Sequence, residues 1–293
     1  MRQFTVGEND GGQRLDKFLS KLMPNMPKSM LYKGLRKKCV RLNGKHIKDG
    51  ACFVSTGDVL MLYFADEFFA KENSFKYVKP RFDVVYEDDN ILVVNKPVGL
   101  LCHSDENGNG DTLVDMVRSY LYDTGEYNPQ NEQTFSPALC NRLDRNTGGL
   151  VIAAKNALSL REVNSSIKER RIRKFYTAVV CGTPPKTGHL ENMLERSDKV
   201  TKVSDRGKTA SLDYRVIESK NGFSTVEIEL HTGRTHQIRA QFADFGFPLA
   251  GDTKYGGVGE KYRQALYSTR LILNFDEDSP LAYLDGKEIK LSD

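Results

Sequence analysis

Apolar and polar positions near the N-terminus alternate first with the period of helices and then with that of strands. Residues 14–23 carry apolar side chains at helical spacing, and Pro24 ends this predicted helix. A second helix is expected from Ser29, a residue type that often caps helices, with Leu31 and Leu35 on its buried side. Two short amphipathic helices are therefore predicted.

The segment after these helices has the two-residue period of strands. Residues 40–47 predict a hairpin, because their central Asn-Gly pair suits a type I′ turn, and residues 53–64 supply at least one more strand. Residues 66–80 are polar with scattered aromatic side chains and end in proline, which indicates a connector. We therefore expect a compact module over residues 1–65, followed by a linker over residues 66–80.

The remainder of the chain, residues 81–293, mixes strand and helix patterns. A strand, an acidic turn at residues 87–90 and a second strand come first, and a capping-box-like sequence starts a helix from Thr112 to Tyr122. Thr235 is placed to cap a later helix. Further strands are predicted at residues 150–154, 174–180, 208–216 and 223–230. These segments provide ample material for a second, larger domain.

Positive charge is concentrated in the N-terminal module. The net charge of the 293-residue chain is only +4, with a pI of about 8.6, so whole-chain charge is a weak argument for a nucleic-acid partner. Residues 28–48, however, contain no Asp or Glu and carry these cations: Lys28, Lys33, Arg36, Lys37, Lys38, Arg41, Lys45 and Lys48. A charge run is usually a solvated face, but a single-sign field on a compact module favours an anionic partner. We therefore favour RNA binding for this module.

Cysteine spacing and hydropathy indicate a cytoplasmic protein. The five cysteines form no CxxC pair and have no spacing suited to zinc: Cys39, Cys52, Cys102, Cys140 and Cys181. We expect reduced thiols, and neither an apolar signal segment nor a membrane-spanning apolar run of about 18 residues occurs. Residues 105–111 imitate the start of a calcium-binding EF-hand, but the twelfth position is Met116 instead of Glu. No bound metal is predicted.

The clearest candidate for chemistry is Asp144, which lies between Arg142 and Arg145 just before a glycine pair and a predicted buried strand. Neighbouring cations favour the ionised form of a carboxylate, so we expect Asp144 to be an anion at neutral pH. A loop at the lip of a sheet is also a common place for reactive groups. A surface Asp that pairs with arginines or braces a turn has the same pattern, and for an arbitrary Asp that role is commoner. Spacing alone leaves both roles open.

Three ordered motifs resemble the RluA-type pseudouridine synthase family. They are RLDRNTGGL at residues 142–150, KFYTAVVCG at residues 174–182 and TGRTHQIRAQFADFGFPLAGDTKYG at residues 232–256. Residues 27–48, PKSMLYKGLRKKCVRLNGKHIK, resemble the alpha-L RNA-binding motif in the form carried by the RluC branch of this family. The resemblance covers nearly the whole chain.

The resemblance implies an isomerase that breaks the bond from uridine N1 to the ribose, turns the base and rejoins it through C5. Asp144 is then the one catalytic carboxylate, Tyr176 stacks on the target base, and Arg239 pairs with the Asp. Arg142 faces the same pocket. Whether the Asp attacks C1′ or removes a ribose proton stays open. The reaction demands no cofactor and no metal.

The implied fold is α+β: a small N-terminal RNA-binding module joined to a pseudouridine-synthase-like catalytic domain, residues 81–293, with a mixed, mostly antiparallel sheet and flanking helices. The implied substrate is structured RNA, foremost large-subunit ribosomal RNA, and we expect a monomer. His236 is expected to bind RNA or brace a turn. The expected RNA contacts, which position the enzyme without choosing the base, are Lys28, Lys33, Arg36, Lys37, Lys38, Arg41 and Arg234.

Two further segments leave alternatives open. NKPVGLL resembles a family segment close to the active site, and its Lys96 is as readily a solvent-exposed cation at a strand end as a residue near RNA. The polar segment at residues 197–206 is a candidate for a loop that closes on RNA.

Four positions depart from the family pattern: Asn141 and Gln241 replace common histidines, Gly148 replaces a common serine, and Tyr267 replaces a histidine near the C-terminus. None removes the Asp, Tyr or Arg assigned above. They weaken the transfer of any particular target uridine, because such positions line or support the pocket.

Two other functions remain as alternatives. A non-catalytic RNA-binding or ribosome-assembly factor on the same fold would keep its cellular function in Asp144→Asn. A hydrolase of glycosidic bonds would use two flanking carboxylates and release uracil, and Asp252 is the nearest second candidate in the motifs.

Overall fold

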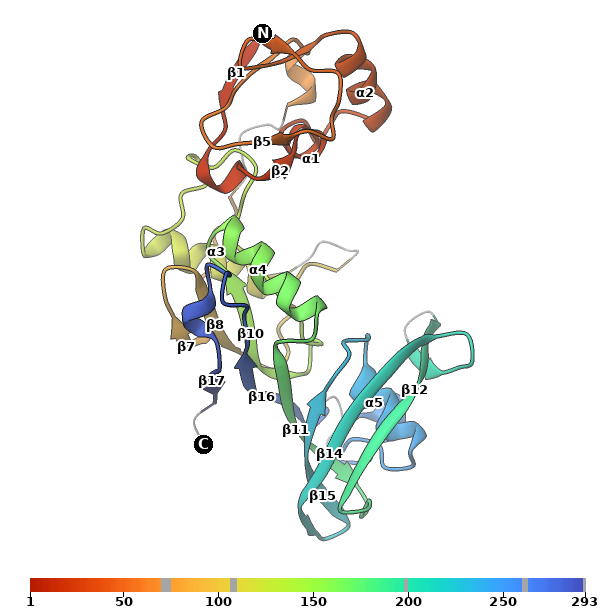
Figure 1. Ribbon diagram of the computed structural model, residues 1–293. Helices are drawn as coiled ribbons and strands as arrows, with labels where there is room; N and C mark the ends of the chain where they lie inside the picture. The colour runs from red at the N-terminus through yellow and green to blue at the C-terminus, as the bar shows by residue number, and fades with distance from the viewer. Residues whose placement is uncertain (70–74, 106–109, 198–199, 260–262, 292–293) are drawn as a thin grey trace. The chain divides into compact units, whose positions relative to one another are not determined.

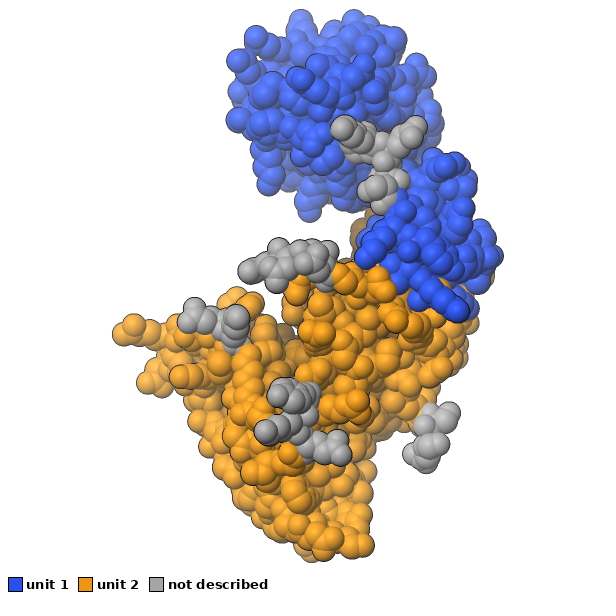
Figure 2. Space-filling model, turned by 180° about the vertical axis from the view of Figure 1, so that it is seen from behind, with its two compact units in different colours: residues 1–79, 118–137, 155–158 blue, residues 80–117, 138–154, 159–293 orange. Residues whose placement is uncertain are grey.

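The computed structural model describes residues 1–69, 75–105, 110–197, 200–259 and 263–291. It divides into two compact units, coloured separately in Figure 2. The first unit contains residues 1–79, 118–137 and 155–158, and the second contains residues 80–117, 138–154 and 159–293. The predicted boundaries at residues 65 and 80 remain a prediction. No helix in the described part of the chain is long and apolar enough to cross a membrane.

Residues 1–69 of the first unit form two α-helices and two small sheets (Figure 1). The helices are α1 (Leu15–Leu22) and α2 (Lys28–Arg36). The larger sheet has the strand order β1 (Arg2–Thr5), β6 (Val59–Leu62), β3 (Val40–Leu42) and β4 (Lys45–His46), and the smaller one pairs β2 (Gln13–Arg14) with β5 (Phe53–Val54). Its core contains the apolar stripe of α1 together with Leu31 and Leu35 of α2.

The N-terminal predictions are confirmed except for one helix cap. Asn43 and Gly44 have φ values of 49° and 79°, as a type I′ hairpin turn requires, and they join β3 to β4. Helix α2 begins at Lys28 with Pro27 at the N-cap position, so Ser29 lies inside the helix and does not cap it. Proline suits the start of a helix, because the missing N–H would have no intrahelical partner there.

The connector packs more closely than its composition indicates. A short 3-10 turn forms at Asp66–Phe68, and Phe69 is buried against the core of the first unit. Val78 is buried as well, and its backbone N–H donates a 2.8 Å hydrogen bond to Ser119 Oγ. Residues 70–74 lie outside the described part.

The second unit is built on a mixed sheet of eleven strands among the described residues, which confirms the predicted α+β class. Its main path is β13 (Val200–Val203), β12 (Thr187–Ser197), β14 (Lys208–Lys220), β15 (Phe223–Leu230), β11 (Arg173–Cys181), β16 (Leu266–Leu273), β10 (Gly148–Ala154), β8 (Ile91–Lys96) and β7 (Asp83–Glu87). In addition, β17 (Lys287–Lys290) pairs with β16 and β9 (Ala138–Leu139) with β10. The pair β10 and β16 is parallel, whereas the neighbouring pairs β8–β10 and β11–β16 are antiparallel.

The glycine pair after Asp144 belongs to β10, whereas the predicted strand began only at residue 150. Gly149 has a φ of 107°, and a Cβ atom there would lie 2.1 Å from Ser268 O in β16. Only glycine permits this backbone approach. The strand therefore starts two residues earlier than the apolar run indicates, because Gly148 and Gly149 pair with Tyr267 and Ser268.

Three longer helices accompany this sheet in the sequence: α3 (Leu113–Asp123), α4 (Ala157–Lys168) and α5 (Gln237–Asp244). Phe242 of α5 packs edge-on against Tyr214 of β14 at 5.4 Å between ring centroids. The expected loop at residues 197–206 instead contributes β13 to a hairpin with β12, and residues 198–199 lie outside the described part. Residues 106–109 of the EF-hand-like loop also lie outside it.

Candidate active site

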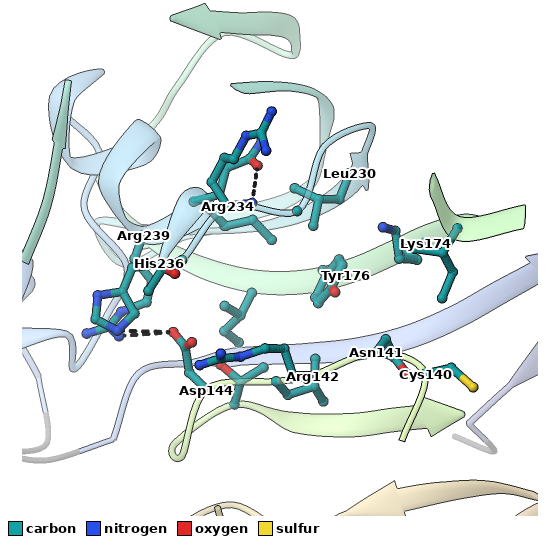
Figure 3. Close-up of a pocket in the computed structure, with 18 residues that line it drawn as sticks. Cys140, Asn141, Arg142, Asp144, Lys174, Tyr176, Leu230, Arg234, His236 and Arg239 are labelled. Carbon is teal, nitrogen blue, oxygen red and sulfur yellow. Dashed lines mark hydrogen bonds and ion pairs between the residues drawn. The ribbon is translucent and has the colours of Figure 1, made fainter. Parts of the chain in front are cut away.

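The RLDR, KFY and HQIR motifs meet at one pocket of the second unit, with a volume of about 270 Å³ (Figure 3). This volume lies near the lower end of the range for small-molecule sites, about 300–1,000 Å³. The pocket is lined by Cys140, Asn141, Arg142, Leu143, Asp144, Thr147, Ile167, Lys174, Tyr176, Leu230, Gly233, Arg234, Thr235, His236, Gln237, Ile238, Arg239 and Leu266. All four side chains predicted for the reaction are among them.

Asp144 projects into this pocket from the loop before β10. Its backbone carbonyl accepts a 3.1 Å hydrogen bond from Thr147 N–H, which closes a turn. Its side chain is 23% exposed, and Arg239 Nη1 donates a 3.1 Å hydrogen bond to Asp144 Oδ2. A charge-assisted bond of this kind fixes the carboxylate while leaving part of it open to the pocket.

A second carboxylate holds the guanidinium of Arg239 from behind. Arg239 Nε donates to Asp252 Oδ2 at 2.6 Å, and Nη2 donates to Asp252 Oδ1 at 2.9 Å. The side chains are only 8% and 2% exposed. Burial lowers the pKa of Arg239, but the hydrogen bonds to Asp252 and the nearby charge of Asp144 outweigh it and raise that pKa overall. One fixed cation therefore bridges two carboxylates.

His236 lies at the start of α5, in the position where Thr235 was expected. It is the N-cap residue with a left-handed backbone (φ 52°), so the prediction that Thr235 caps the helix is wrong. His236 Nδ1 lies 2.9 Å from Tyr255 Oη, and Nε2 lies 3.7 Å from Asp144 Oδ2. Burial lowers the pKa of His236 despite Asp144, so the imidazole is neutral at pH 7 and Arg239 remains the cation beside Asp144.

Tyr176 reaches the pocket from strand β11. Lys174 and Tyr176 line the pocket together, because alternate residues of a strand share a face. The Tyr176 side chain is buried, and burial, with a further contribution from Asp144, raises its pKa, so the phenol is neutral. Burial also lowers the pKa of Lys174. The pocket thus presents one flat aromatic ring between an acidic and a basic side chain.

Lys96 is completely buried, which contradicts its interpretation as an exposed cation at a strand end. Its Nζ donates hydrogen bonds to the carbonyls of Pro97, Leu100 and Arg145 at 3.0, 2.8 and 3.2 Å. Burial lowers its pKa to about 8, so the ammonium persists at pH 7, and its three N–H groups match the three acceptors. Because Arg145 follows Asp144 directly, Lys96 braces the loop that carries this carboxylate.

The remaining predicted arginines lie in different places. Arg145 Nε donates to Gly99 O at 3.1 Å, so it does not flank Asp144 in space as its position in the sequence suggested. Arg142 is exposed and lines the pocket. Arg234 also lines it, but its Nε donates to Thr209 O at 3.0 Å, as expected for a residue that braces a turn.

The four departures from the family pattern have structural partners. Asn141 Oδ1 accepts a 2.8 Å hydrogen bond from Ile152 N–H, which supports β10. Gln241 is buried and donates to Leu190 O, Asn192 Oδ1 and Ala210 O. A Cβ atom on Gly148 would lie 2.7 Å from the Tyr267 ring. Two of the departures therefore belong together, because Tyr267 occupies the space of a side chain at position 148.

The cations predicted to bind RNA lie mainly on the surface of the first unit. Lys28, Lys33, Arg36, Lys37 and Lys38 are exposed along α2 and the turn after it. Arg41 differs, because it is half buried and its guanidinium lies over the Tyr63 ring at 5.8 Å. The exposed cations can contact the phosphates of an RNA backbone.

The sequence predicted Asp144, Tyr176 and Arg239 but missed their supports. Asp252 was noted only as a possible second catalytic carboxylate, and Lys96 was not assigned to the site. The signal available for Lys96 was its position at the end of a predicted strand, directly before proline. No local pattern indicates that Asp252 faces Arg239, because 13 residues separate them.

Comparisons with known proteins identify the family of this chain. The sequence model of the family described as RNA pseudouridylate synthase matches residues 90–244, and that of the S4 domain matches residues 13–60. An uncharacterized RNA pseudouridine synthase of Mycoplasma capricolum is 32% identical, over 99% of this chain and 97% of its own. Ribosomal large subunit pseudouridine synthase D of Borreliella burgdorferi is 31% identical, over 95% of this chain and 86% of its own.

A solved structure shares the fold. Human RNA Pseudouridylate Synthase Domain Containing 1 is similar with a TM-score of 0.56 and 23% identity, over 73% of this chain and 84% of its own. The likeness of the N-terminal part to the RluC branch remains a prediction, because the Borreliella burgdorferi relative is a synthase D. The chain therefore belongs to the RNA pseudouridylate synthase family, whose members isomerise uridine in RNA, and it carries an S4 domain in its N-terminal part.

Proposed function

We propose that this enzyme isomerises uridines of large-subunit ribosomal RNA and that Asp144 is its catalytic carboxylate. One observation supports the assignment most directly: Asp144 is partly open to a pocket and hydrogen-bonded to Arg239 at 3.1 Å, with Tyr176 in the same pocket lining. The choice of ribosomal RNA rests on the relative named as a large-subunit synthase, which is similar over 95% of this chain.

The reaction requires a carboxylate beside the ribose of the target nucleotide. The bond between N1 and C1′ breaks, the base turns, and a bond forms between C5 and C1′, while a proton leaves C5 and N1 gains one. Asp144 takes part in these reaction steps either by bonding to C1′ or by removing a ribose proton. Both roles need the carboxylate oxygen that faces the pocket, and Arg239 holds it there.

The size of the pocket favours a single base that has left its stack. At about 270 Å³ it suits one nucleoside rather than a base pair, so the target uridine enters by flipping out of the RNA. The Tyr176 ring offers an apolar face for uracil, and Lys174, Arg142 and Arg234 supply positive charge for phosphates at the pocket wall. The exposed cations of α2 bind phosphates farther along the RNA.

The position of Asp252 argues against hydrolysis as the main reaction. A hydrolase needs a second carboxylate that is free to activate water, whereas both oxygens of Asp252 accept hydrogen bonds from Arg239. We further propose that the enzyme acts as a cytoplasmic monomer without a cofactor or metal in the reaction. Its five cysteines are free, as a reducing compartment requires.

The test compares wild type, Asp144→Asn and Asp83→Asn on ribosomal RNA transcribed without modifications. Asp83 is an exposed carboxylate of β7 outside the pocket, so its variant is the matched control. We expect pseudouridine with wild type and Asp83→Asn, no pseudouridine with Asp144→Asn, and similar RNA affinity for all three. Full turnover by Asp144→Asn would refute the role of Asp144, and release of free uracil would favour hydrolysis.

The same variants show whether the cellular function of the protein is catalytic or that of a non-catalytic assembly factor. If ribosome assembly in cells depends on the protein but not on Asp144, the non-catalytic function is the relevant one. Mapping pseudouridine in ribosomal RNA from cells with and without the protein identifies the modified positions. If the pseudouridines of large-subunit RNA are the same in both cells and those of transfer RNA differ, the substrate is transfer RNA.

A further inference from the structure

Three potential metal ligands converge at a place that the uridine reaction does not use. His189 Nδ1 lies 2.6 Å from Asp213 Oδ1, and His231 Nε2 lies 2.7 Å from Asp213 Oδ2. Suitable ligand atoms of the three residues all lie within 4.8 Å of one another. His189 of β12 is directly opposite Asp213 of β14, and His231 follows the end of β15, the next strand. Two adjacent strands and the residue after a third therefore supply one ligand each.

The cluster faces away from helix α5. Asp213 lies between the buried residues Leu212 and Tyr214, and Tyr214 packs on Phe242 of α5. Successive side chains of a strand point to opposite faces, so Asp213 points to the other side of the sheet. The side chains of His189 and Asp213 are 52% and 53% exposed, which leaves the site open to ions from solvent. None of the three residues lines the Asp144 pocket.

We propose that His189, Asp213 and His231 form a binding site for a divalent transition-metal ion such as Zn²⁺. Two imidazole nitrogens and one carboxylate are the nitrogen and oxygen donors that such ions prefer. Bonds of about 2.0–2.2 Å to the metal place neighbouring donors roughly 3.3 Å apart in tetrahedral geometry. The present contacts of 2.6 and 2.7 Å must therefore widen slightly, which exposed side chains achieve by rotating.

The surroundings of His189 fit this role. Its Nδ1 faces Asp213, while its Nε2 lies 3.7 Å from Glu191 Oε2. A histidine that binds metal through one nitrogen usually donates the other N–H to a carboxylate or carbonyl, which fixes the ring and its tautomer. Glu191, on the same face of β12, is placed to accept that hydrogen bond.

Another nearby carboxylate is already engaged. Glu229 accepts two hydrogen bonds from Arg173, at 2.7 and 2.9 Å, and is therefore a poor fourth ligand. Water completes the coordination. Because the ligands come from β12, β14 and the end of β15, the ion would tie these strands together and stabilise the sheet, apart from the chemistry at Asp144.

This site has no short sequence motif. Asp213 is separated from His189 by 24 residues and from His231 by 18, so only strand pairing brings them together. The proposal departs from our expectation that the chain binds no metal. The proposed ion does not enter the isomerisation.

The test titrates Zn²⁺ into the metal-stripped, full-length protein by calorimetry, with thermal unfolding measured at each metal concentration. We expect one saturable site and a rise in Tm, because an ion that binds only the folded state stabilises it. His189→Gln, His231→Gln and Asp213→Asn each weaken binding at least about tenfold, and Glu191→Gln weakens it by about 10–100-fold. His46→Gln is the matched control, since His46 is exposed in β4, and it retains wild-type affinity.

Two results would overturn the proposal. One is unchanged Zn²⁺ affinity in the double variant His189→Gln, His231→Gln. The other is a thiolate charge-transfer band when Co²⁺ binds wild type, because that band would assign the metal to cysteine instead. The Co²⁺ spectrum needs no variant, so it decides the question even if a substitution disturbs folding.

Discussion

Asp252 and Arg239 share two buried hydrogen bonds, Nε to Oδ2 at 2.6 Å and Nη2 to Oδ1 at 2.9 Å. This pairing uses two of the three guanidinium nitrogens and directs the third, Nη1, to Asp144 at 3.1 Å. Lysine cannot provide this arrangement, because a single ammonium lacks the rigid fork of the guanidinium. The geometry at Asp144 therefore depends on a residue that does not line the pocket.

Replacing Asp252 should impair both stability and turnover. Asp252→Asn removes the negative charge from a buried pair and leaves Arg239 partly uncompensated, which should cost about 3 kcal/mol of unfolding free energy. The freed guanidinium no longer holds Asp144, so we expect kcat to fall while RNA affinity stays the same. Urea unfolding and single-turnover kinetics measure the two effects. Wild-type kcat in Asp252→Asn would show that the pairing does not position the carboxylate.

The contributions of the Tyr176 ring and of its hydroxyl can be tested separately. Tyr176→Leu removes the flat face and should weaken productive binding of the target nucleotide by about 1–3 kcal/mol, the range for aromatic stacking on a base. Tyr176→Phe keeps the ring, so any loss of kcat in that variant reports on the hydroxyl. Steady-state kinetics on a short RNA substrate distinguish them. Equal activity of Tyr176→Leu and wild type would exclude stacking.

Lys96 should matter for stability more than for RNA binding. Lys96→Met keeps the length of the side chain but removes the ammonium hydrogen bonds to the carbonyls of Pro97 and Leu100, and a hydrogen bond to a charged group contributes about 1.5–3 kcal/mol. We expect unfolding at lower urea concentration and a reduced kcat, because Arg145 O beside Asp144 also loses a hydrogen bond. Unchanged urea unfolding in Lys96→Met would contradict the bracing role.

The cations of α2 should determine the salt dependence of RNA binding. The triple variant Lys33→Gln, Arg36→Gln, Lys37→Gln removes three exposed charges from one helix and the turn after it. Each lost phosphate contact reduces the slope of log affinity against log salt by about 0.7–0.9, so the slope should fall by about two to three. Filter binding over a range of salt concentrations gives the slope.

A matched control changes the same net charge elsewhere. Lys186→Gln, Lys220→Gln, Lys290→Gln alters three exposed lysines of the second unit that do not line the pocket. We expect a smaller change of slope than with the α2 variant. Equal slopes would mean that α2 binds no phosphates. Point substitutions are preferable to deletion of residues 1–65, because Gln133 Nε2 donates to Thr5 O and residues 118–137 belong to the same unit.

Acid should weaken the contact between the two N-terminal helices. Hydrogen bonds from Arg14 and Tyr32 hold the pKa of Asp16 at about 2, below its usual 3.8. A lowered carboxylate pKa contributes stability above pH 3.8 that is lost as the pH falls toward 2. The difference in Tm between wild type and Asp16→Asn should therefore be largest near neutrality and shrink over this range. A constant difference would point to packing instead of charge.

Local patterns predicted the parts of the site that depend on neighbours in the chain. Strand alternation placed Tyr176 correctly, and the motif around Asp144 placed that residue on a loop before a strand. The electrostatic partner of Asp144 was harder to predict from local patterns. The adjacent Arg145 donates to Gly99 O, whereas the guanidinium that contacts Asp144 belongs to Arg239, 95 residues later. Sequence proximity and spatial proximity differ here, because a loop can direct successive side chains to opposite sides.

The residues that support the site, and those of the histidine cluster, could be identified only from the folded structure. Lys96 is buried because the segment after β8 folds back over it, and no propensity indicates that. The resemblance to the family did identify Arg239, since it carries information about contacts that periodicity lacks. The resemblance did not indicate His189, Asp213 and His231, because these residues lie in or after separate strands and share no motif.

The close approach of Gly149 to Ser268 also limits how this enzyme can diversify. No side chain fits at Gly149 without separating β10 from β16, and Tyr267 fills the space beside Gly148. A side chain at position 149 is therefore excluded, and one at position 148 requires a smaller residue at position 267. We expect relatives that modify other target nucleotides to change positions 148 and 267 together, because only a joint change leaves the pairing of β10 with β16 intact.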